Sequence, residues 1–368
     1  MARPVSSGPT IRILIDSFAD AGLLNAQMGN AREIACRLDC SRFHISMFVS
    51  GEPDSRLAQR PNTGFIRLPK RRQTVRVLRE FLWGDHDILF YLKSSPASRS
   101  YMSLRRAWSD GRTVIGTMES QSDLRNEPTV TANAIRLWER TVLKSDYLFS
   151  NSRSVQKSLD REYGVQSEIV PTGVDTEFFT PDLQREPNTR PRVLFVGSLR
   201  PFKQPQLLLD AALRFPQADF CIVGEGPLGA ELKSRTERER LANVSLLGSR
   251  NAEQLRKEYQ SADVFLFPSA WEGSPKVILE AAACGLPVIA RNTYSPETVV
   301  HGITGYQAAS DSEIMSFLEA LLASSELRGK LGRNGRQHSL SYDWSLIASQ
   351  WAEVFEKVAS SRRIRKAS

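Results

Sequence analysis

Apolar residues along this chain fall into short runs, separated by longer segments of mixed polarity. Runs of this length between turn-forming residues predict buried β-strands, and the longer segments between them predict helices. Strand–helix alternation of this kind is typical of a parallel sheet that is covered by helices on both faces. The first series of predicted strands comprises residues 11–15, 45–49, 65–68, 88–92, 113–118 and 147–149.

The alternation is interrupted once and then begins again. Residues 181–191 contain Pro, Asn and charged residues with little apolar content, which is typical of a linker. A chain of 368 residues usually forms more than one core, so we expect an N-terminal domain over 1–180 and a C-terminal domain over 192–342. The second series of strands is predicted at 192–196, 220–223, 244–247, 264–267, 288–290 and 304–308, and a last helix begins near residue 343.

The charge balance indicates an anionic partner. Lys and Arg number 49 against 41 Asp and Glu, a net charge of +8, which favours nucleotide phosphates or an anionic membrane surface. No zinc-finger, homeodomain or RNA-binding motif is present, so nucleic acid is not expected. The four His and four Cys lack metal-ligand spacing, so no metal is expected.

Neither a membrane span nor a signal peptide is evident in the hydropathy pattern. No apolar stretch is long enough to cross a bilayer, and the first ten residues lack the apolar core of a signal peptide. We therefore expect a cytoplasmic protein, either free or peripheral on the inner face of the membrane. Residues 70–83 form a basic, partly amphipathic segment that fits an anchor on anionic lipid or an acceptor face, although an ordinary solvated helix is the favoured interpretation.

Two glutamates flank the start of one predicted helix. After the strand at 264–267, Ser274 is predicted to cap the helix and Pro275 to occupy its first position. Glu272 then lies in the loop before the helix and Glu280 lies about two turns into it. Free amides near the helix start suit a phosphate, and a neighbouring carboxylate suits sugar hydroxyls. A solvated surface helix that happens to carry two glutamates is the plainer alternative.

The whole block resembles the donor-site motif of the retaining glycosyltransferases of family 4, which have the GT-B fold. The resemblance rests on the acidic loop, the Pro at the helix start, the three alanines at 281–283 and the Gly-x-Pro ending. It implies an α/β protein of two Rossmann-like domains whose parallel sheets face across a cleft. It also implies that the C-terminal helix at 343–368 crosses back to the N-terminal domain.

The same resemblance implies an enzyme that moves a sugar from a nucleotide-diphosphate sugar to a hydroxyl acceptor with retention of configuration. UDP and GDP are the expected nucleotides, and no metal or other cofactor is implied. The acceptor could be a glycan, a lipid-linked glycan or a small molecule. A GT-B sugar-nucleotide epimerase or hydrolase, or a non-catalytic sugar-nucleotide-binding protein, remains the alternative, and the oligomeric state is left open.

Roles for individual residues follow from the resemblance. Lys203 matches the lysine that holds the donor diphosphate, while Arg200 is a less certain match because Ser198 stands where the family often has an arginine. Glu272 would contact the sugar hydroxyls and Glu280 the ribose, and neither is expected to have a packing role. The backbone around the phosphates would be supplied by Gly273, Ser274, Lys276 and Val277.

Three glycines complete the expected donor site. The segment 224–229 fits the G-x-G-x-x-G dinucleotide fingerprint, but the acidic residue expected about twenty positions later is missing. The segment instead resembles the Gly-x-Gly-Pro loop of the glycosyltransferases, which gives Gly226 a donor-binding role. Gly248 would lie beside the nucleotide base. Gly22, after the first strand, is a looser match to the family's phosphate loop.

One position departs from the family pattern. Members often carry a His at the end of a late N-terminal strand, where this chain reads Gly-Thr-Met-Glu-Ser over 116–120. Glu119 could orient the acceptor hydroxyl or support positive charge at the anomeric carbon. It could equally mark a chain that is specialised away from the usual substrates.

Overall fold

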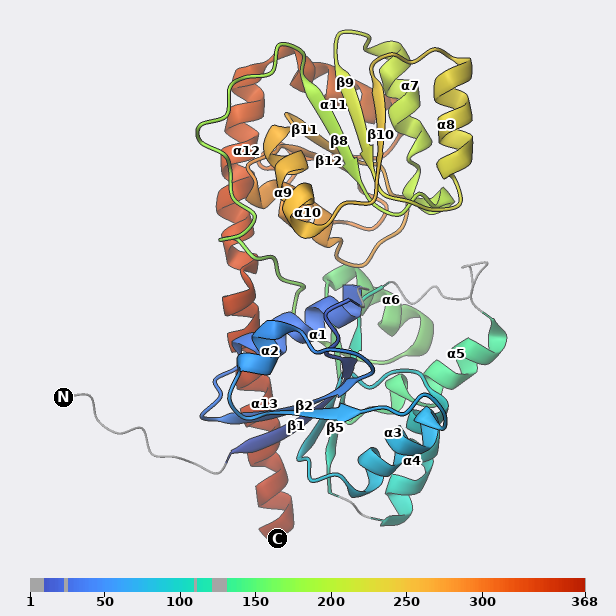
Figure 1. Cartoon of the computed structure of the whole chain (residues 1–368), viewed down its shortest axis with the longest axis vertical. Coiled ribbons are helices and arrows are strands. Elements are labelled where there is room, and N and C mark those ends of the chain that lie inside the picture. The colour runs from blue at the N-terminus through green and yellow to red at the C-terminus, as the bar shows by residue number, and fades with distance from the viewer. Residues whose placement is uncertain (1–9, 23–25, 109–110, 121–130, 368) are drawn as a thin grey trace, which may run out of the picture. The chain divides into compact units, whose positions relative to one another are not determined.

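The computed structural model describes residues 10–22, 26–108, 111–120 and 131–367, and the chain divides into two compact units (Figure 1). Unit 1 comprises Met1–Pro171 together with Trp344–Ser368, and unit 2 comprises Thr172–Asp343. The proline-containing segment 181–191 belongs to unit 2 in this division. Each unit contains one parallel sheet, as the alternating pattern predicts.

Unit 1 is organised by a parallel sheet that is buried on both faces. Within the described residues its strand order is β3-β2-β1-β4-β5-β6-β7. The strand β1 is buried along almost its whole length, which is why its sequence is continuously apolar rather than alternating. The strands are β1 (Ile11–Phe18), β2 (Phe43–Val49), β3 (Thr63–Arg67), β4 (Ile88–Phe90), β5 (Thr113–Met118), β6 (Tyr147–Ser150) and β7 (Glu168–Ile169).

Alternate residues of β1 pack against different helices, because successive side chains of a strand point to opposite faces. Ile13 and Ile15 belong to one cluster and Leu14 to another. The first cluster includes α1 and α13, and the second includes α3 and α4. The helices of unit 1 are α1 (Ala26–Arg37), α2 (Ser55–Gln59), α3 (Gln73–Trp83), α4 (Pro96–Trp108), α5 (Ala132–Glu139), α6 (Arg153–Tyr163) and α13 (Trp344–Ala367).

The C-terminal helix α13 is part of the unit 1 core, as the resemblance implied. Trp351 is 3% exposed, and its ring centroid lies 4.6 Å from that of Phe90 on β4 and 4.9 Å from that of Phe149 on β6. Phe355 packs against the same group, with its ring edge-on to that of Phe90 and the two centroids 4.9 Å apart. Aromatic pairs at such distances contribute beyond their buried area. The chain therefore leaves unit 1 after β7 and returns to complete its core.

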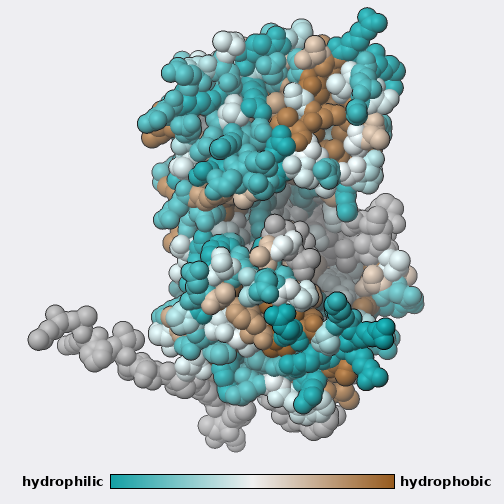
Figure 2. Space-filling view, in the orientation of Figure 1, coloured by the Kyte–Doolittle hydropathy of each residue, from teal (hydrophilic) through white to brown (hydrophobic). Residues whose placement is uncertain are grey.

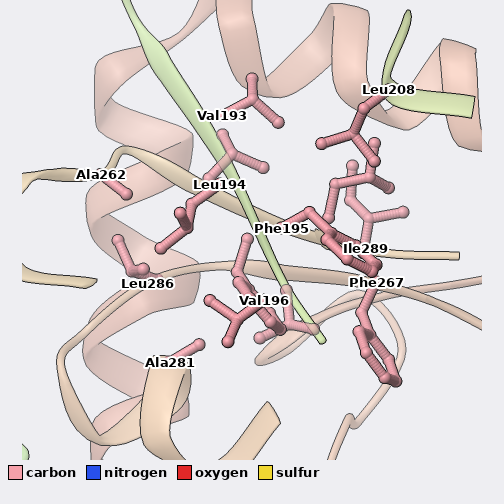
Figure 3. Close-up of a cluster of buried hydrophobic side chains, with 14 of the residues drawn as sticks. Val193, Leu194, Phe195, Val196, Leu208, Ala262, Phe267, Ala281, Leu286 and Ile289 are labelled. Atoms are coloured by element: carbon pink, nitrogen blue, oxygen red, sulfur yellow. The ribbon is translucent and has the colours of Figure 1, made fainter. Parts of the chain in front are cut away.

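Unit 2 repeats the same strand order, without the last edge strand of unit 1. Its described strands lie in the order β10-β9-β8-β11-β12-β13, all parallel. Figure 3 shows how aliphatic and aromatic side chains of β8 meet those of the neighbouring strands and helices in one buried cluster. The strands are β8 (Arg192–Val196), β9 (Asp219–Val223), β10 (Val244–Gly248), β11 (Val264–Phe267), β12 (Val288–Arg291) and β13 (Gly305–Ala308).

Helices cover the unit 2 sheet, and the surface is mainly polar. On the face shown in Figure 2, hydrophilic side chains dominate and apolar ones form scattered patches. Among the described residues, no helix combines the length and apolar character needed to cross a bilayer. The helices of unit 2 are α7 (Gln206–Arg214), α8 (Gly229–Arg238), α9 (Ala252–Ser261), α10 (Lys276–Ala283), α11 (Asp311–Ala323) and α12 (Ser325–Ser339).

In both sheets the strand order reverses direction at one point, between β1 and β4 and between β8 and β11. The connections that follow these two strands leave in opposite directions, so a crevice remains at their carboxyl ends, where ligands of open α/β sheets bind. Functional side chains are therefore expected in the segments after β1, β4, β8 and β11.

The packing of α13 gives a stability prediction. Replacing Trp351 with Ala should lower the free energy of unfolding of unit 1 by about 3–5 kcal/mol, because a large buried ring is removed and leaves a cavity. Urea denaturation followed by circular dichroism would measure the loss. The exposed Glu353 on the same helix provides the control, and Glu353→Ala should change stability by less than about 0.5 kcal/mol. Similar losses in the two variants would show that α13 contributes little through its buried face.

Candidate functional site

The loops after β8 and β9 pack against each other through glycine backbone. Gly224 has φ +135°, and a Cβ atom there would lie 1.9 Å from the carbonyl oxygen of Gly197. A Cβ on Gly226 would lie 2.7 Å from the carbonyl oxygen of Leu199. The amide of Leu199 donates to the carbonyl of Glu225 at 3.0 Å. Glycine is thus required at both positions because two backbones meet there, independently of any ligand.

Lys203 and Glu272 form an ion pair at the carboxyl ends of β8 and β11. Their side chains are only 15% and 12% exposed, so each charge is largely removed from water. Ser269 donates its hydroxyl to the Oε1 atom of Glu272 at 2.6 Å, and the amide of Ala270 donates to the carbonyl of Phe202 at 2.8 Å. These bonds fix the loop after β11 against the short 3-10 helix Pro201–Lys203.

The ammonium group of Lys203 is held by an aromatic face as well as by the carboxylate. Its Nζ atom lies 5.0 Å from the ring centroid of Phe267, the last residue of β11. A cation over an aromatic ring is attracted by the ring's quadrupole. The arrangement places a shielded, oriented positive charge at the crevice of unit 2. Such a charge suits a phosphate group better than a freely solvated lysine would.

The helix α10 begins at Lys276, one residue later than the sequence predicts. Pro275 occupies the N-cap position with φ −70° and ψ 115°, and no side chain caps the helix. The prediction that Ser274 is the N-cap of this helix is therefore wrong. The proline ring restricts φ to a value that an extended cap residue also accepts. Lys276 and Val277 occupy the first turn of α10, where backbone amides in general have no acceptor within the helix.

Glu280 has a structural partner that the sequence did not reveal. The hydroxyl of the fully buried Tyr259 on α9 donates to its Oε2 atom at 3.0 Å. Burial raises the pKa of Glu280, although the charge of Lys276 and the bond from Tyr259 act in the opposite direction. The expectation that Glu280 has no packing role is therefore wrong.

The remaining residues predicted around the donor are placed as follows. Gly273 is buried in the loop before α10, and Gly248 ends β10 with φ +66° and accepts the amide of Gly224 at 2.9 Å. Arg200 is exposed at the edge of the loop after β8, and no side-chain bond is recorded for it among the described residues. Gly22 lies in an exposed turn after β1, within unit 1.

Glu119 lies at the crevice of unit 1, directly after β5. The hydroxyl of Tyr91 and the Nδ2 atom of Asn30 both donate to its Oε1 atom, the latter at 2.8 Å. Tyr91 is 6% exposed and has φ +61°, a conformation that is rare for a bulky residue. The backbone conformation of Tyr91 ends β4 at Phe90, two residues before the predicted end of the strand. Strained backbone of this kind is found preferentially at functional sites.

A second charged pair lies next to Glu119. The main-chain amide of Lys93 donates to the Oδ2 atom of Asp16 at 2.8 Å, and the Lys93 ammonium lies 5.1 Å from the ring centroid of Phe18. Burial raises the pKa of Asp16 and lowers the pKa of Lys93, while the attraction between the two opposes both shifts. A cavity of about 360 Å³ is lined by Tyr91, Lys93, Glu119 and their neighbours.

Sequence reasoning identified Glu119 but missed the groups that surround it. Asp16 lies within β1, and Tyr91 and Lys93 lie within or just after an apolar run. Polar residues at the ends of buried strands were the available signal. The described residues contain no cluster of His, Cys, Asp or Glu that could hold a metal ion.

Comparison with known proteins finds a family model that matches the C-terminal part of the chain. Residues 179–338 match the family model described as "Glycosyl transferases group 1". A D-inositol 3-phosphate glycosyltransferase of Geodermatophilus obscurus is 31% identical over 257 residues, which cover 61% of this chain and 56% of that protein. The corresponding protein of Corynebacterium diphtheriae is 30% identical over 259 residues, covering 63% of this chain and 61% of that protein. The chain thus spans about three fifths of the length of these relatives.

Solved structures share the fold over nearly the whole chain. Sucrose-phosphate synthase from Thermosynechococcus elongatus superposes with a TM-score of 0.80 at 19% identity, covering 96% of this chain and all of that one. Anabaena HepE in complex with UDP and glucose superposes with a TM-score of 0.74 at 18% identity, covering 95% of this chain and all of that one. At such identities the likeness shows the fold alone. It confirms the predicted GT-B architecture of two α/β units with parallel sheets.

The environment of Glu280 predicts a pH effect on stability. Because its pKa is raised above the ordinary value of 4.5, the folded protein retains the proton to a higher pH than the unfolded chain does. The stability contributed by Glu280 is therefore fully present below pH 4.5, the ordinary pKa. It is lost as the pH rises through the higher pKa of the folded protein. Each pKa unit of separation corresponds to about 1.4 kcal/mol.

A comparison with Glu280→Gln isolates this contribution. The Gln side chain can still accept the bond from Tyr259 but cannot ionise, so the stability of the variant relative to the parent should increase as the pH rises above the ordinary value of about 4.5. Urea denaturation of both proteins across this range would measure the difference, in which the other titrating groups cancel. Parallel pH profiles would contradict the raised pKa.

Proposed function

We propose that this protein transfers a sugar from a nucleotide-diphosphate sugar to a hydroxyl acceptor with retention of configuration, because residues 179–338 belong to the glycosyl transferases group 1 family. One observation carries the proposal. The shielded Lys203, the first turn of α10 and the two glutamates all lie at or beside the switch point of unit 2. The complexes of Anabaena HepE with UDP and with UDP-glucose support a uridine nucleotide as the first donor to test.

In this proposal the donor diphosphate binds between Lys203 and the first amides of α10. Negative charge grows on the diphosphate as its bond to the sugar breaks, so oriented positive groups stabilise the transition state more than the ground state. Lys203 supplies a full charge, and the amides of Lys276 and Val277 add the positive end of the helix dipole. Arg200, exposed at the loop edge, is proposed as a further contact once the donor is present.

The ion pair between Lys203 and Glu272 implies an exchange of partners on donor binding. Without an anion beside it, a lysine this far removed from water needs a carboxylate to compensate its charge. A bound diphosphate would supply that compensation. Glu272, still held by Ser269, could then turn its hydrogen-bonding capacity toward the sugar hydroxyls. Glu280 would contact the ribose through the carboxylate oxygen that does not accept the bond from Tyr259.

Unit 1 is proposed to hold the acceptor. Two donors fix the Glu119 carboxylate at the crevice of that unit, and a cavity lies beside it. In the retaining reaction the acceptor oxygen bonds to the anomeric carbon as the bond to the diphosphate breaks, on the same face. The acceptor proton passes to an oxygen of the departing diphosphate. Glu119 would orient the acceptor hydroxyl for this step.

Donor binding and turnover separate the proposal from its alternatives. Calorimetric titration with UDP-, GDP-, ADP- and dTDP-sugars would identify the nucleotide. Turnover that requires an acceptor supports the transferase. Epimerisation or hydrolysis of the donor without an acceptor would identify the other GT-B enzymes, and tight binding with no turnover under either condition would identify a binding protein.

Lys203→Ala is the first kinetic prediction. The variant should lose about 2–4 kcal/mol of transition-state stabilisation, because one oriented charge at the leaving group is removed. Steady-state measurement of kcat/KM for the donor would detect this as a loss of roughly thirtyfold or more. The exposed Lys233 on α8 provides a control of equal charge, and Lys233→Ala should leave kcat/KM unchanged. Near-parental turnover of Lys203→Ala at low donor concentration would remove this lysine from the site.

The two glutamates should respond differently to replacement by Gln. Glu280→Gln should mainly raise KM for the donor, because a ribose contact is equally strong in the ground and transition states. Glu272→Gln should mainly lower kcat, because charge develops at the sugar as the glycosidic bond breaks. Loss of the Glu272 charge also frees Lys203, so the affinity for the free nucleoside diphosphate should stay the same or increase.

Steady-state kinetics and calorimetry on the two variants test this division. Both substitutions keep an oxygen that can accept the bonds from Ser269 and Tyr259. Indistinguishable kinetics for the two variants would overturn the assignment of separate roles. Unfolding of either variant at the assay temperature would instead assign that glutamate to the support of the loop and helix.

A further inference from the structure

A second cavity in unit 1 lies between α4 and α5 and is lined by three arginines. Its volume is about 710 Å³. Arg99 comes from α4, while Arg136 and Arg140 come from α5 and its C-cap, one helical turn apart. The other described lining residues are Pro96, Ser100, Asn133 and Leu137, so none of the lining residues that the structure describes carries a carboxylate.

The positive charge of this cavity is not compensated within the described part of the chain. Arg136 donates to the Oδ1 atom of Asn133 at 2.8 Å, and no ion pair is recorded for Arg99, Arg136 or Arg140. Like charges one helical turn apart repel each other. Several other arginines of unit 1 do have carboxylate partners, among them Arg12 with Asp87, Arg56 with Glu33, Arg76 with Glu80 and Arg105 with Asp146.

The arginine cavity and the cavity lined by Glu119 draw on neighbouring residues of the same two chain segments. Leu137 lines the first and its neighbour Trp138 lines the second. On the other side, Pro96 lines the first and Ser94 the second. Both cavities are therefore lined by residues from the same two stretches of chain, 91–100 and 133–142, which is the basis for expecting one ligand to reach both.

We propose that the cavity formed by Arg99, Arg136 and Arg140 binds a phosphate group of the acceptor, while the acceptor hydroxyl lies beside Glu119. This inference rests on the proposed transferase function and specifies its acceptor as an anionic, phosphate-bearing molecule. The planar guanidinium group donates two parallel hydrogen bonds that match phosphate oxygens. The three arginines repel one another in the free protein, and binding of an anion would relieve that repulsion.

The phosphate could belong to a soluble molecule or to a lipid, and two probes distinguish these sources. Calorimetric titration with pyrophosphate tests the soluble source. It is best done in a Lys203→Ala background, which weakens the proposed donor site as a competing phosphate binder. Cosedimentation with phosphatidylglycerol vesicles, compared with phosphatidylcholine vesicles, tests the lipid source. The basic helix α3, for which a membrane anchor is the less favoured interpretation, is compared in the same assay.

Two triple variants with equal charge change make the test specific. The cavity variant carries Arg99→Gln, Arg136→Gln and Arg140→Gln. The control carries Arg71→Gln, Arg72→Gln and Arg79→Gln, at or beside α3 in the same unit. We expect the cavity variant to bind pyrophosphate about tenfold more weakly or worse, since one charge-assisted hydrogen bond contributes about that much. The control should bind pyrophosphate as the parent does.

Each outcome decides the proposal. Vesicle binding that is lost only in the cavity variant, with little binding of pyrophosphate, would support the site and assign the phosphate to a lipid. Equal losses of binding in the two triple variants would show that net charge alone causes the effect, which would overturn the proposal. Binding of both probes by the cavity variant as strongly as by the parent would also overturn it. Donor affinity should be equal in parent and cavity variant. A parent that binds no nucleotide sugar would refute the transferase function, whereas normal donor binding without phosphate binding would refute only this inference.

Discussion

The reversal of strand order within each parallel sheet is the constraint on which the functional groups depend. Between β8 and β11, and again between β1 and β4, neighbouring strands send their connections in opposite directions. Their carboxyl ends are therefore left open, and side chains there need not be covered by the next helix. Lys203 and Glu272 are placed by this reversal in unit 2, and Tyr91 and Lys93 in unit 1.

The backbone contacts in unit 2 make its site rigid before any ligand binds. Gly224 and Gly226 let the loops after β8 and β9 meet, and a side chain at either position would collide with main-chain atoms. Ser269 and the Lys203–Glu272 pair then fix the loop after β11. A site held in this way loses little conformational entropy when it binds, which is the advantage of preorganisation.

In unit 1, several charged groups are buried at an energetic cost. Asp16 and Lys93 are buried enough that their pKa values move toward the neutral forms, and Tyr91 adopts a strained backbone conformation. Such features cost stability wherever they occur. They are found preferentially at sites of binding or chemistry. Together with the arginines that line the cavity between α4 and α5, they are the features on which the proposed acceptor role of this unit rests.

The alternating apolar runs determined the α/β class, the positions of nearly all strands and the two-unit organisation. This was possible because strands that are buried on both faces have nearly continuous apolar sequences. The motif around Glu272 and Glu280 indicated by resemblance the family whose model matches residues 179–338. Only the tertiary structure decided that Glu272 pairs with Lys203, that Glu280 supports Tyr259, and that α10 begins after Pro275. It also decided that Tyr91 and Asn30 hold Glu119 and that three arginines line one cavity. These groups are distant in sequence, and their proximity depends on strand order and helix packing, which local patterns do not encode.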